Sequence, residues 1–301
     1  MITVADELHF DRVCRDVLLA DRDRDGIGTL KEKKLHTMLK FFVCEDKSCH
    51  EIRLGLPRQS ESPGLPGAPE SPALPGAPES PGSPGAPESP ASPESSLPEG
   101  GARARGFVAD VLCGNDIFEI QTGTLYPLRD KIEFYLGQTG YNVTVIHPLV
   151  AKKRVTYLSP VDAHVVRRVS SPKHEHAVDM VAELYSLLPF LGNPRLRIRA
   201  MMLEMEEFRI QNKRGRHGAI RYEKIPTRLL DILDFNAPAD YLPHFPAMLP
   251  SEFTASEFGR AAGLRGMDVY SALKVFVAMG LAAPYGKRGR AATYTVTNPA
   301  K

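Results

Sequence analysis

The chain has 301 residues and a formal net charge of +2, with 43% hydrophobic and 25% charged residues, as in soluble globular proteins long enough for two domains. No apolar run reaches the roughly 18 residues of a membrane helix. The first residues are acidic where a signal peptide would be basic. We therefore expect a cytoplasmic protein without a membrane segment.

Charge is unevenly distributed along the chain. The first 100 residues carry 11 Lys and Arg against 17 Asp and Glu, whereas the remaining residues carry 27 against 19. A basic C-terminal two-thirds is compatible with a polyanionic partner such as nucleic acid, although it does not require one.

The N-terminal region predicts two helices, at 4–20 and 29–43, followed by a short strand at 50–55. Thr29 and Glu32 have the spacing of a capping box at the start of the second helix. The sequence between the helices, "DRDRDGIGTLKE", matches a calcium-binding loop in which Asp21, Asp23, Asp25 and Glu32 supply the oxygen ligands. The alternative is an acidic, solvated turn between two helices.

Residues 57–103 are predicted to be a disordered insertion. The motif "GAPESP" recurs with a nine-residue period in a segment made almost wholly of Pro, Gly, Ala, Ser and Glu. Such a segment buries too little apolar surface to offset the entropy lost on ordering, and polyproline II character is expected.

The stretch "GFVADVLCGNDIFEIQTG" predicts a β-hairpin that turns at Gly114-Asn115. Pairing Cys113 with Asp116 places Asp110 opposite Glu119 and puts Gln121 on the same face. Opposed like charges are destabilising unless a cation lies between them. Two carboxylates on adjacent strands supply the hard oxygen ligands that Mg²⁺ prefers.

The four cysteines, Cys14, Cys44, Cys49 and Cys113, show no C-x-x-C spacing. Reduced thiols that pack as small apolar groups are the predicted state, with a zinc site as the alternative.

Helices and strands alternate after the hairpin, which predicts a mixed sheet of the α/β or α+β class. The expected elements are a helix at 124–137, strands at 142–150 and 154–158, a helix at 176–190 and a long strand at 195–205. From about 240 the pattern becomes two helices, 253–264 and 266–281, then two short strands around a basic turn. This order is typical of a winged helix, whose second helix would enter a major groove.

Several stretches resemble the PD-(D/E)XK nuclease superfamily, and within it a bacterial family that couples a nuclease-like domain to a C-terminal winged helix. The matching stretches are "GIGTLKEKKLHTMLKFF", "CHEIRLG", "GFVADVLCGNDIFEIQTG", "SPK" and "EMEEFRI". They cover roughly 26–56 and 106–226, with the tail from 250. The implied fold is a restriction-endonuclease-like mixed-sheet core interrupted by the Pro-rich insertion.

The resemblance implies Asp110 and Glu119 as ligands of Mg²⁺ or Mn²⁺, with Glu32 beside the metal. Ala109 replaces the proline of the motif. Gln121 replaces its lysine and would position the attacking water without supplying charge. The missing cation is then expected from one of three lysines, Lys131, Lys153 or Lys173.

These patterns predict a metal-dependent nuclease that hydrolyses phosphodiester bonds, with DNA the favoured substrate. The predicted parts are 1–56 and 104–235 for the nuclease-like domain and 240–301 for the winged helix. Nucleic-acid contacts are expected from five cations: Lys153, Lys173, Lys287, Arg288 and Arg290. The alternatives are a non-catalytic DNA-binding regulator on the same scaffold and a calcium-binding protein that uses the 21–32 loop.

Overall fold

The computed structural model describes residues 2–22, 34–55, 106–172, 174–212 and 218–297. Contacts divide the chain into Met1–Leu54 together with Phe107–Lys301 as one unit and Gly55–Gly106 as another. Most of the second unit, and with it the predicted insertion at 57–103, lies outside the described residues. No helix of the described part is long and apolar enough to cross a membrane.

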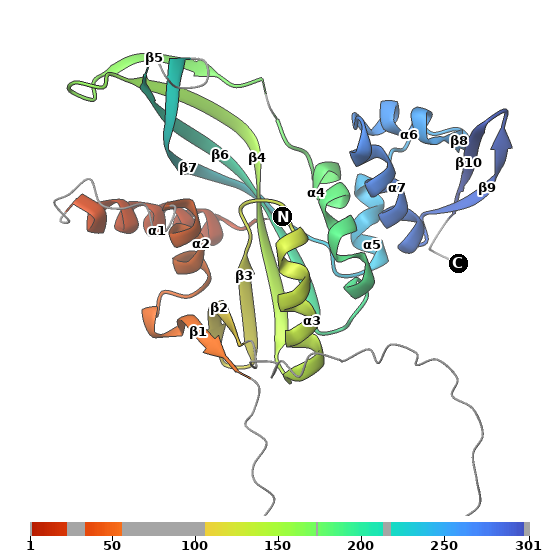
Figure 1. The fold of residues 1–301 in the computed structure, drawn as a ribbon, viewed down its shortest axis with the longest axis horizontal. Coiled ribbons are helices and arrows are strands. Elements are labelled where there is room, and N and C mark those ends of the chain that lie inside the picture. Colours follow the sequence, from red (N-terminus) through yellow and green to blue (C-terminus); the bar gives the residue numbers. More distant parts are fainter. Residues whose placement is uncertain (1, 23–33, 56–105, 173, 213–217, 298–301) are drawn as a thin grey trace, which may run out of the picture. The chain divides into compact units, whose positions relative to one another are not determined.

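The larger unit is built on a mixed sheet of seven strands, which confirms the predicted α/β class (Figure 1). The strand order is β1 (His50–Leu54), β2 (Phe107–Cys113), β3 (Asp116–Ile120), β4 (Asn142–Leu158), β6 (Leu196–Gln211) and β7 (Ala219–Asp234). The seventh strand, β5 (Val165–Ser170), pairs with β4. Strands β3, β4 and β6 are parallel, and the remaining pairs are antiparallel.

Strand β4 is one strand of 17 residues, so the prediction of two strands at 142–150 and 154–158 was wrong. Its whole length pairs with β6 on one side. On the other side β3 pairs with residues 142–146 and β5 with residues 154–158. Pro148 lies between these two stretches. β6 pairs with it through Met201, but on the opposite edge neither β3 nor β5 reaches it, so a missing N–H on that edge interrupts no ladder.

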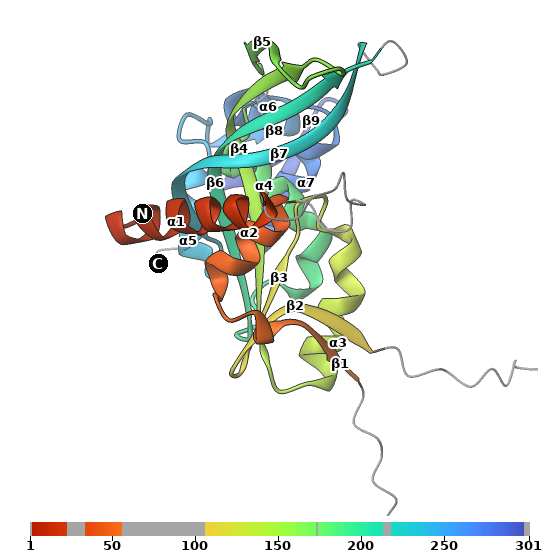
Figure 2. The ribbon, with the colours of Figure 1, turned by 90° about the vertical axis from the view of Figure 1, so that its left-hand side faces the viewer.

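Helices cover both faces of this sheet (Figure 2). Apolar residues of α1 (Val4–Arg22) and α2 (Lys34–Val43) form one core with Ile146, Met201 and Leu203. Apolar residues of α3 (Arg129–Gln138) and α4 (Ala177–Glu183) form a second core with Val143 and Val145. The alternation of buried residues along β4 thus serves two cores, as expected for a sheet covered on both faces.

The predicted helices are largely confirmed, with changes at their ends. The helix expected at 124–137 is a 3₁₀ turn, η2 (Tyr126–Leu128), followed by α3. The helix expected at 176–190 is α4 continued by the 3₁₀ helix η3 (Leu184–Phe190), which contains Pro189. Proline in a helix removes a hydrogen bond and clashes with the preceding turn, so the α-helix ends before it.

The C-terminal region has a small sheet of three strands in the order β8-β10-β9. After α5 (Pro238–Tyr241) and the 3₁₀ turn η5 (Leu242–His244), the order is β8 (Glu252–Thr254), α6 (Ala255–Ala262), α7 (Met267–Ala278), β9 (Ala282–Arg288) and β10 (Ala291–Val296). The hydroxyl of Thr254 accepts from the Glu257 N–H, and the Glu257 carboxylate accepts from the Thr254 N–H, so a capping box begins α6. Both predicted helices and both strands around the basic turn are present.

Helix α7 is packed on two sides. Phe276 lies in the core with Phe258 of α6, and the same helix contacts α4 and η3. Lys274 Nζ donates to the hydroxyl of Tyr185 at 3.2 Å and lies over its ring. Part of the helix that was expected to enter a DNA groove is therefore covered by the rest of the protein.

The extended part of β6 contains a buried carboxylate surrounded by cations. Glu207 has no exposed side-chain surface, and its oxygens lie 3.2 Å from Lys153 Nζ, 2.7 Å from Arg209 and 3.1 Å from Arg221. Burial alone would raise the pKa of Glu207, but the hydrogen bonds from Arg209 and Lys153 and the charge of Arg221 outweigh it and lower the pKa to about 2.

We expect Glu207→Gln to lower the free energy of unfolding by about 3 kcal/mol at pH 7, because three cations lose their buried partner. Because folding lowers the pKa of Glu207, its ionised carboxylate stabilises the fold at pH values above 4.5, its ordinary pKa. This stabilisation is lost as the pH falls towards 2. The variant should therefore lose part of the acid sensitivity of the wild type, measured by urea unfolding at several pH values. Glu206→Gln, on the adjacent and more exposed residue, is the matched control; equal losses from both variants would contradict the assignment.

Candidate functional site

The hairpin that carries the predicted site has the expected register. Cys113 pairs with Asp116, Leu112 with Ile117 and Val111 with Phe118. The backbone ladder ends there, and the next bond runs from the Ile120 N–H to a carboxylate oxygen of Asp110 at 2.8 Å. The two strands therefore part at the position where the sequence places the acidic pair.

Asp110 is held by helix α2. His36 Nε2 donates to its Oδ2 at 3.2 Å, and Lys40 Nζ lies 3.9 Å from its Oδ1. Burial would raise the pKa of Asp110, but the hydrogen bond and charge of His36, with the Ile120 N–H, lower it overall. Asp110 is therefore an ionised carboxylate, and 18% of its side chain remains accessible.

Glu119 is held by helix α3 and is almost completely buried, at 1% exposure. Lys131 Nζ donates to its Oε2 at 2.6 Å and the Tyr135 hydroxyl donates to its Oε1 at 3.0 Å. Burial raises the pKa of Glu119 to about 7; the charge of Lys131 opposes this rise and that of Asp110 adds to it.

The two acids are thus clamped in the same manner from two helices. His36 and Lys40 are four residues apart on α2, and Lys131 and Tyr135 are four residues apart on α3. Residues with this spacing lie one above the other on a helix face. This i, i+4 spacing of polar residues can be read from the sequence, but of the four residues only Lys131 was predicted, as one of three lysines that could supply the missing cation.

Gln121 does not share the site in the predicted way. Its side-chain amide donates to the Thr124 carbonyl at 2.6 Å and stabilises the turn after β3. Its backbone carbonyl accepts from His147 Nδ1 at 2.7 Å. Burial lowers the pKa of His147, which keeps that ring neutral. The role of Gln121 in positioning a reacting water stays a prediction.

The other predicted residues are placed as follows. Glu32, Asp23, Asp25 and Lys173 lie outside the described residues, and of Asp21 only its backbone, in the last turn of α1, is described. Lys153 pairs with Glu207 on the extended sheet. Arg288 of β9 donates to the Glu257 carboxylate at 2.9 Å, whereas Lys287 and Arg290 are exposed at the β9–β10 turn.

The cysteines are reduced as predicted, but three of them are not buried among apolar groups. Cys14 alone is buried, and burial raises its pKa to about 12. The sulfur atoms of Cys44, Cys49 and Cys113 lie within 4.8 Å of one another and are partly exposed. Burial and the two neighbouring thiols raise the pKa of Cys113 to about 12. Sequence spacing could not reveal this group because its members are separated by the insertion.

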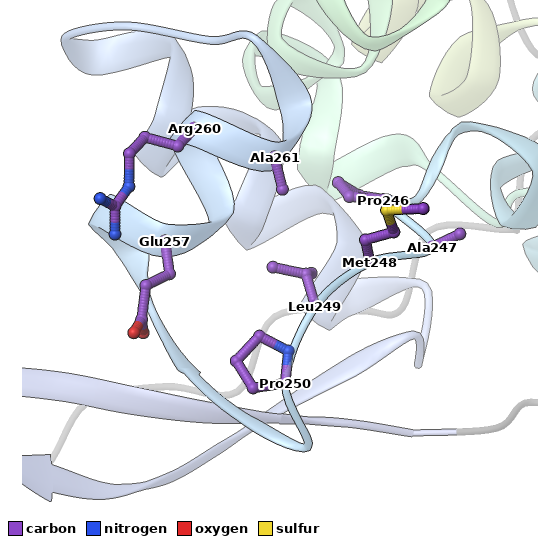
Figure 3. Close-up of a pocket in the computed structure, with 8 residues that line it drawn as sticks. All are labelled: Pro246, Ala247, Met248, Leu249, Pro250, Glu257, Arg260 and Ala261. Carbon is purple, nitrogen blue, oxygen red and sulfur yellow. The ribbon is translucent and has the colours of Figure 1, made fainter.

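One surface hollow lies away from the hairpin. A hollow of about 540 Å³ lies between residues 246–250 and helix α6, where Leu249 and Ala261 line it with Glu257 and Arg260 (Figure 3). No residue of the hairpin lines it. The candidate site is therefore a set of clamped carboxylates at the point where two strands part, outside that pocket.

Asp110 and Glu119 offer hard oxygen donors, which fit Mg²⁺ in their chemistry. Asp110 is ionised and partly accessible. Both oxygens of Glu119 are already engaged by Lys131 and Tyr135, so an ion would share this carboxylate with them. The two carboxylates therefore fit Mg²⁺ if Lys131 gives up part of its contact with Glu119.

Comparisons with known proteins match part of the chain. Residues 99–236, which include the hairpin, α3 and strands β4, β6 and β7, match the family model described as "Domain of unknown function (DUF8091)". No curated protein and no solved structure matches the chain.

The raised pKa of Glu119 gives a testable pH dependence. Between the ordinary pKa of 4.5 and the folded value of about 7, the folded protein binds more protons than the unfolded chain, so the free energy of unfolding falls as pH rises. We expect Glu119→Gln to remove this fall, and Lys131→Met to extend it to higher pH because the opposing charge is removed. Urea unfolding from pH 4 to 9 measures both. Glu133→Gln, on the exposed face of the same helix, should leave the profile unchanged.

Proposed function

We propose that the protein hydrolyses phosphodiester bonds of nucleic acid, most favourably DNA, in a divalent-metal-dependent reaction at Asp110 and Glu119. The observation that carries the proposal is that two carboxylates whose charges interact lie on parting strands, each beside a lysine from a different helix. A cluster of buried acids with perturbed pKa values and specific charge partners is a candidate catalytic site. On this proposal the mixed sheet is a PD-(D/E)XK core and the C-terminal region is a winged helix.

Mg²⁺ or Mn²⁺ would be held by Asp110 and Glu119, and such an ion polarises a phosphoryl oxygen and lowers the pKa of a bound water. The nuclease motif has a lysine where this chain has Gln121. Lys131 would take the role of that lysine, because its ammonium group already lies beside Glu119. It would offset negative charge that develops on the phosphate. His36 orients Asp110 and lowers its pKa, and Lys40, which donates to Glu51, lies 3.9 Å from the Asp110 carboxylate.

The order of elements supports the proposal from a second direction. The acidic residues come from an antiparallel hairpin whose second strand joins a parallel strand, β4, and α3 connects the two. Helix α2, which precedes the hairpin in sequence, contacts Asp110 through His36. Glu32, which the resemblance places beside the metal, shortly precedes this helix in sequence and lies outside the described residues.

A cleavage assay tests the proposal. Plasmid and single-stranded DNA are incubated with Mg²⁺ or Mn²⁺ and with wild type, Asp110→Asn or Glu119→Gln. We expect cleavage by the wild type and a loss of about 100-fold or more in each variant, the size typical when one group that stabilises the transition state is removed. Asp116→Asn is the matched control, because this carboxylate lies on the same hairpin and contacts Asn142 and Arg197 instead. Equal cleavage by all four proteins, or none with any metal, would remove the assigned chemistry.

A second candidate, a DNA-binding regulator without hydrolytic activity, is favoured by two observations. The Gln121 amide is committed to Thr124, and both oxygens of Glu119 have partners within the fold. In this case the site residues stabilise the scaffold, and DNA is held by the exposed cations at the β9–β10 turn.

Binding at the β9–β10 turn can be measured separately from cleavage. Removing one cation that neutralises a phosphate should reduce the slope of log K against log salt by about 0.9. We expect the Lys287→Ala, Arg290→Ala double variant to weaken DNA binding and to reduce this slope by about 1.8. Arg288→Ala, the control, should change it less because Arg288 is engaged by Glu257. An unchanged slope in the double variant would exclude this turn as the region that holds DNA.

A further inference from the structure

Three cysteines from three separate elements meet at one end of the large sheet. Cys44 directly follows α2, Cys49 ends the 3₁₀ helix η1 (Lys47–Cys49), and Cys113 is the last residue of β2. Their sulfur atoms all lie within 4.8 Å of one another. All three thiols are free, and a disulfide between any two would leave the third unpaired.

The backbone beneath these side chains is fixed by hydrogen bonds. The Cys44 N–H donates to the Lys40 carbonyl at 2.9 Å, and the Cys49 N–H donates to the Asp46 carbonyl at 3.1 Å. The Asp46 side chain caps η1 by accepting from the Ser48 N–H at 2.8 Å. His50 Nε2 donates to the Cys44 carbonyl at 2.9 Å. The loop that carries Cys44 and Cys49 is therefore held in place by its own hydrogen bonds and needs no ligand for this.

The arrangement of sulfurs suits a thiophilic ion. Zn²⁺ binds thiolates at about 2.3 Å in tetrahedral geometry, which places neighbouring sulfurs about 3.8 Å apart. The observed group needs a contraction of about 1 Å at most to reach this spacing. Thiolate ligands favour Zn²⁺ over hard ions such as Mg²⁺. No further His, Asp or Glu within the described ranges joins the group, so the fourth position would be taken by solvent.

We propose that Cys44, Cys49 and Cys113 form a Zn²⁺ site that ties α2 and η1 to strand β2. The site is distinct from the carboxylate pair and does not depend on the proposed hydrolysis. Its position gives it a structural consequence. Helix α2 carries His36 and Lys40, which contact Asp110, and Asp110 and Cys113 belong to the same strand. An ion bound here fixes the helix and the strand that together hold Asp110.

The test uses the full-length protein, reduced and freed of metal by chelation, and then titrated with Zn²⁺. We expect one Zn²⁺ per chain by native mass spectrometry, a raised midpoint of thermal unfolding, and protection of three of the four thiols from alkylation. Co²⁺ is the spectroscopic probe, since thiolate ligation produces charge-transfer absorption that oxygen ligation lacks. Cys49→Ser and Cys113→Ser should each weaken Zn²⁺ binding by about 10-fold or more.

Cys14→Ala is the matched control, because this cysteine is buried in α1 outside the group; it should bind Zn²⁺ as the wild type does. Circular dichroism without metal checks that the serine variants fold, and the stoichiometry and alkylation of the wild type test the site without any variant. The proposal is overturned if reduced wild type takes up no stoichiometric Zn²⁺, if the serine variants bind as tightly as the wild type, or if two of the three thiols form a disulfide that reforms in the presence of Zn²⁺.

Discussion

The parallel ladder between β4 and β6 is the constraint on which the rest of the large sheet depends. Both strands are long, and they pair from Val143 with Leu196 to Leu158 with Ile210. This leaves the other edge of β4 to be shared by two shorter strands, β3 at its beginning and β5 at its end. The hairpin is therefore anchored at one end of β4, and that anchor fixes where its carboxylates lie.

Burying two carboxylates beside this ladder is costly, and the fold offsets the cost with hydrogen bonds and charges from neighbouring side chains. Desolvation and mutual repulsion both raise the pKa of Glu119, and Lys131 supplies a full opposing charge. Asp110 is better compensated, through His36 and the Ile120 N–H. If the site holds a metal ion as proposed, ionised Asp110 would be its more available ligand, and Glu119 would share its carboxylate between the ion and Lys131.

Local features were predictable where turn chemistry and short-range pairing decide the structure. The Gly114-Asn115 turn sets the register of the hairpin, and the pairing of Cys113 with Asp116 follows from it. Strand β4 was divided in two at residues 151–153, where two lysines separate two apolar runs. Pro148 is tolerated because neither β3 nor β5 pairs with its edge of β4 at this position. Where β3 ends and β5 begins is not visible in the local sequence. The clamps on Asp110 and the meeting of three cysteines need contacts across about 60 or more residues, beyond any spacing rule.

The same long-range pairing explains how an insertion can divide this domain. Leu54 at the end of β1 and Phe107 at the start of β2 are partners in the ladder, so the segment between them leaves and re-enters the fold at adjacent points. Closing about 50 residues instead of about five costs roughly 2 kcal/mol more, because closure entropy grows only with the logarithm of length. At the opposite end of the same strand pair, His50 pairs with Val111 and the three thiols gather. A metal ion at these thiols would join the chain on both sides of the insertion, which makes the position of α2 against Asp110 independent of the length of the loop.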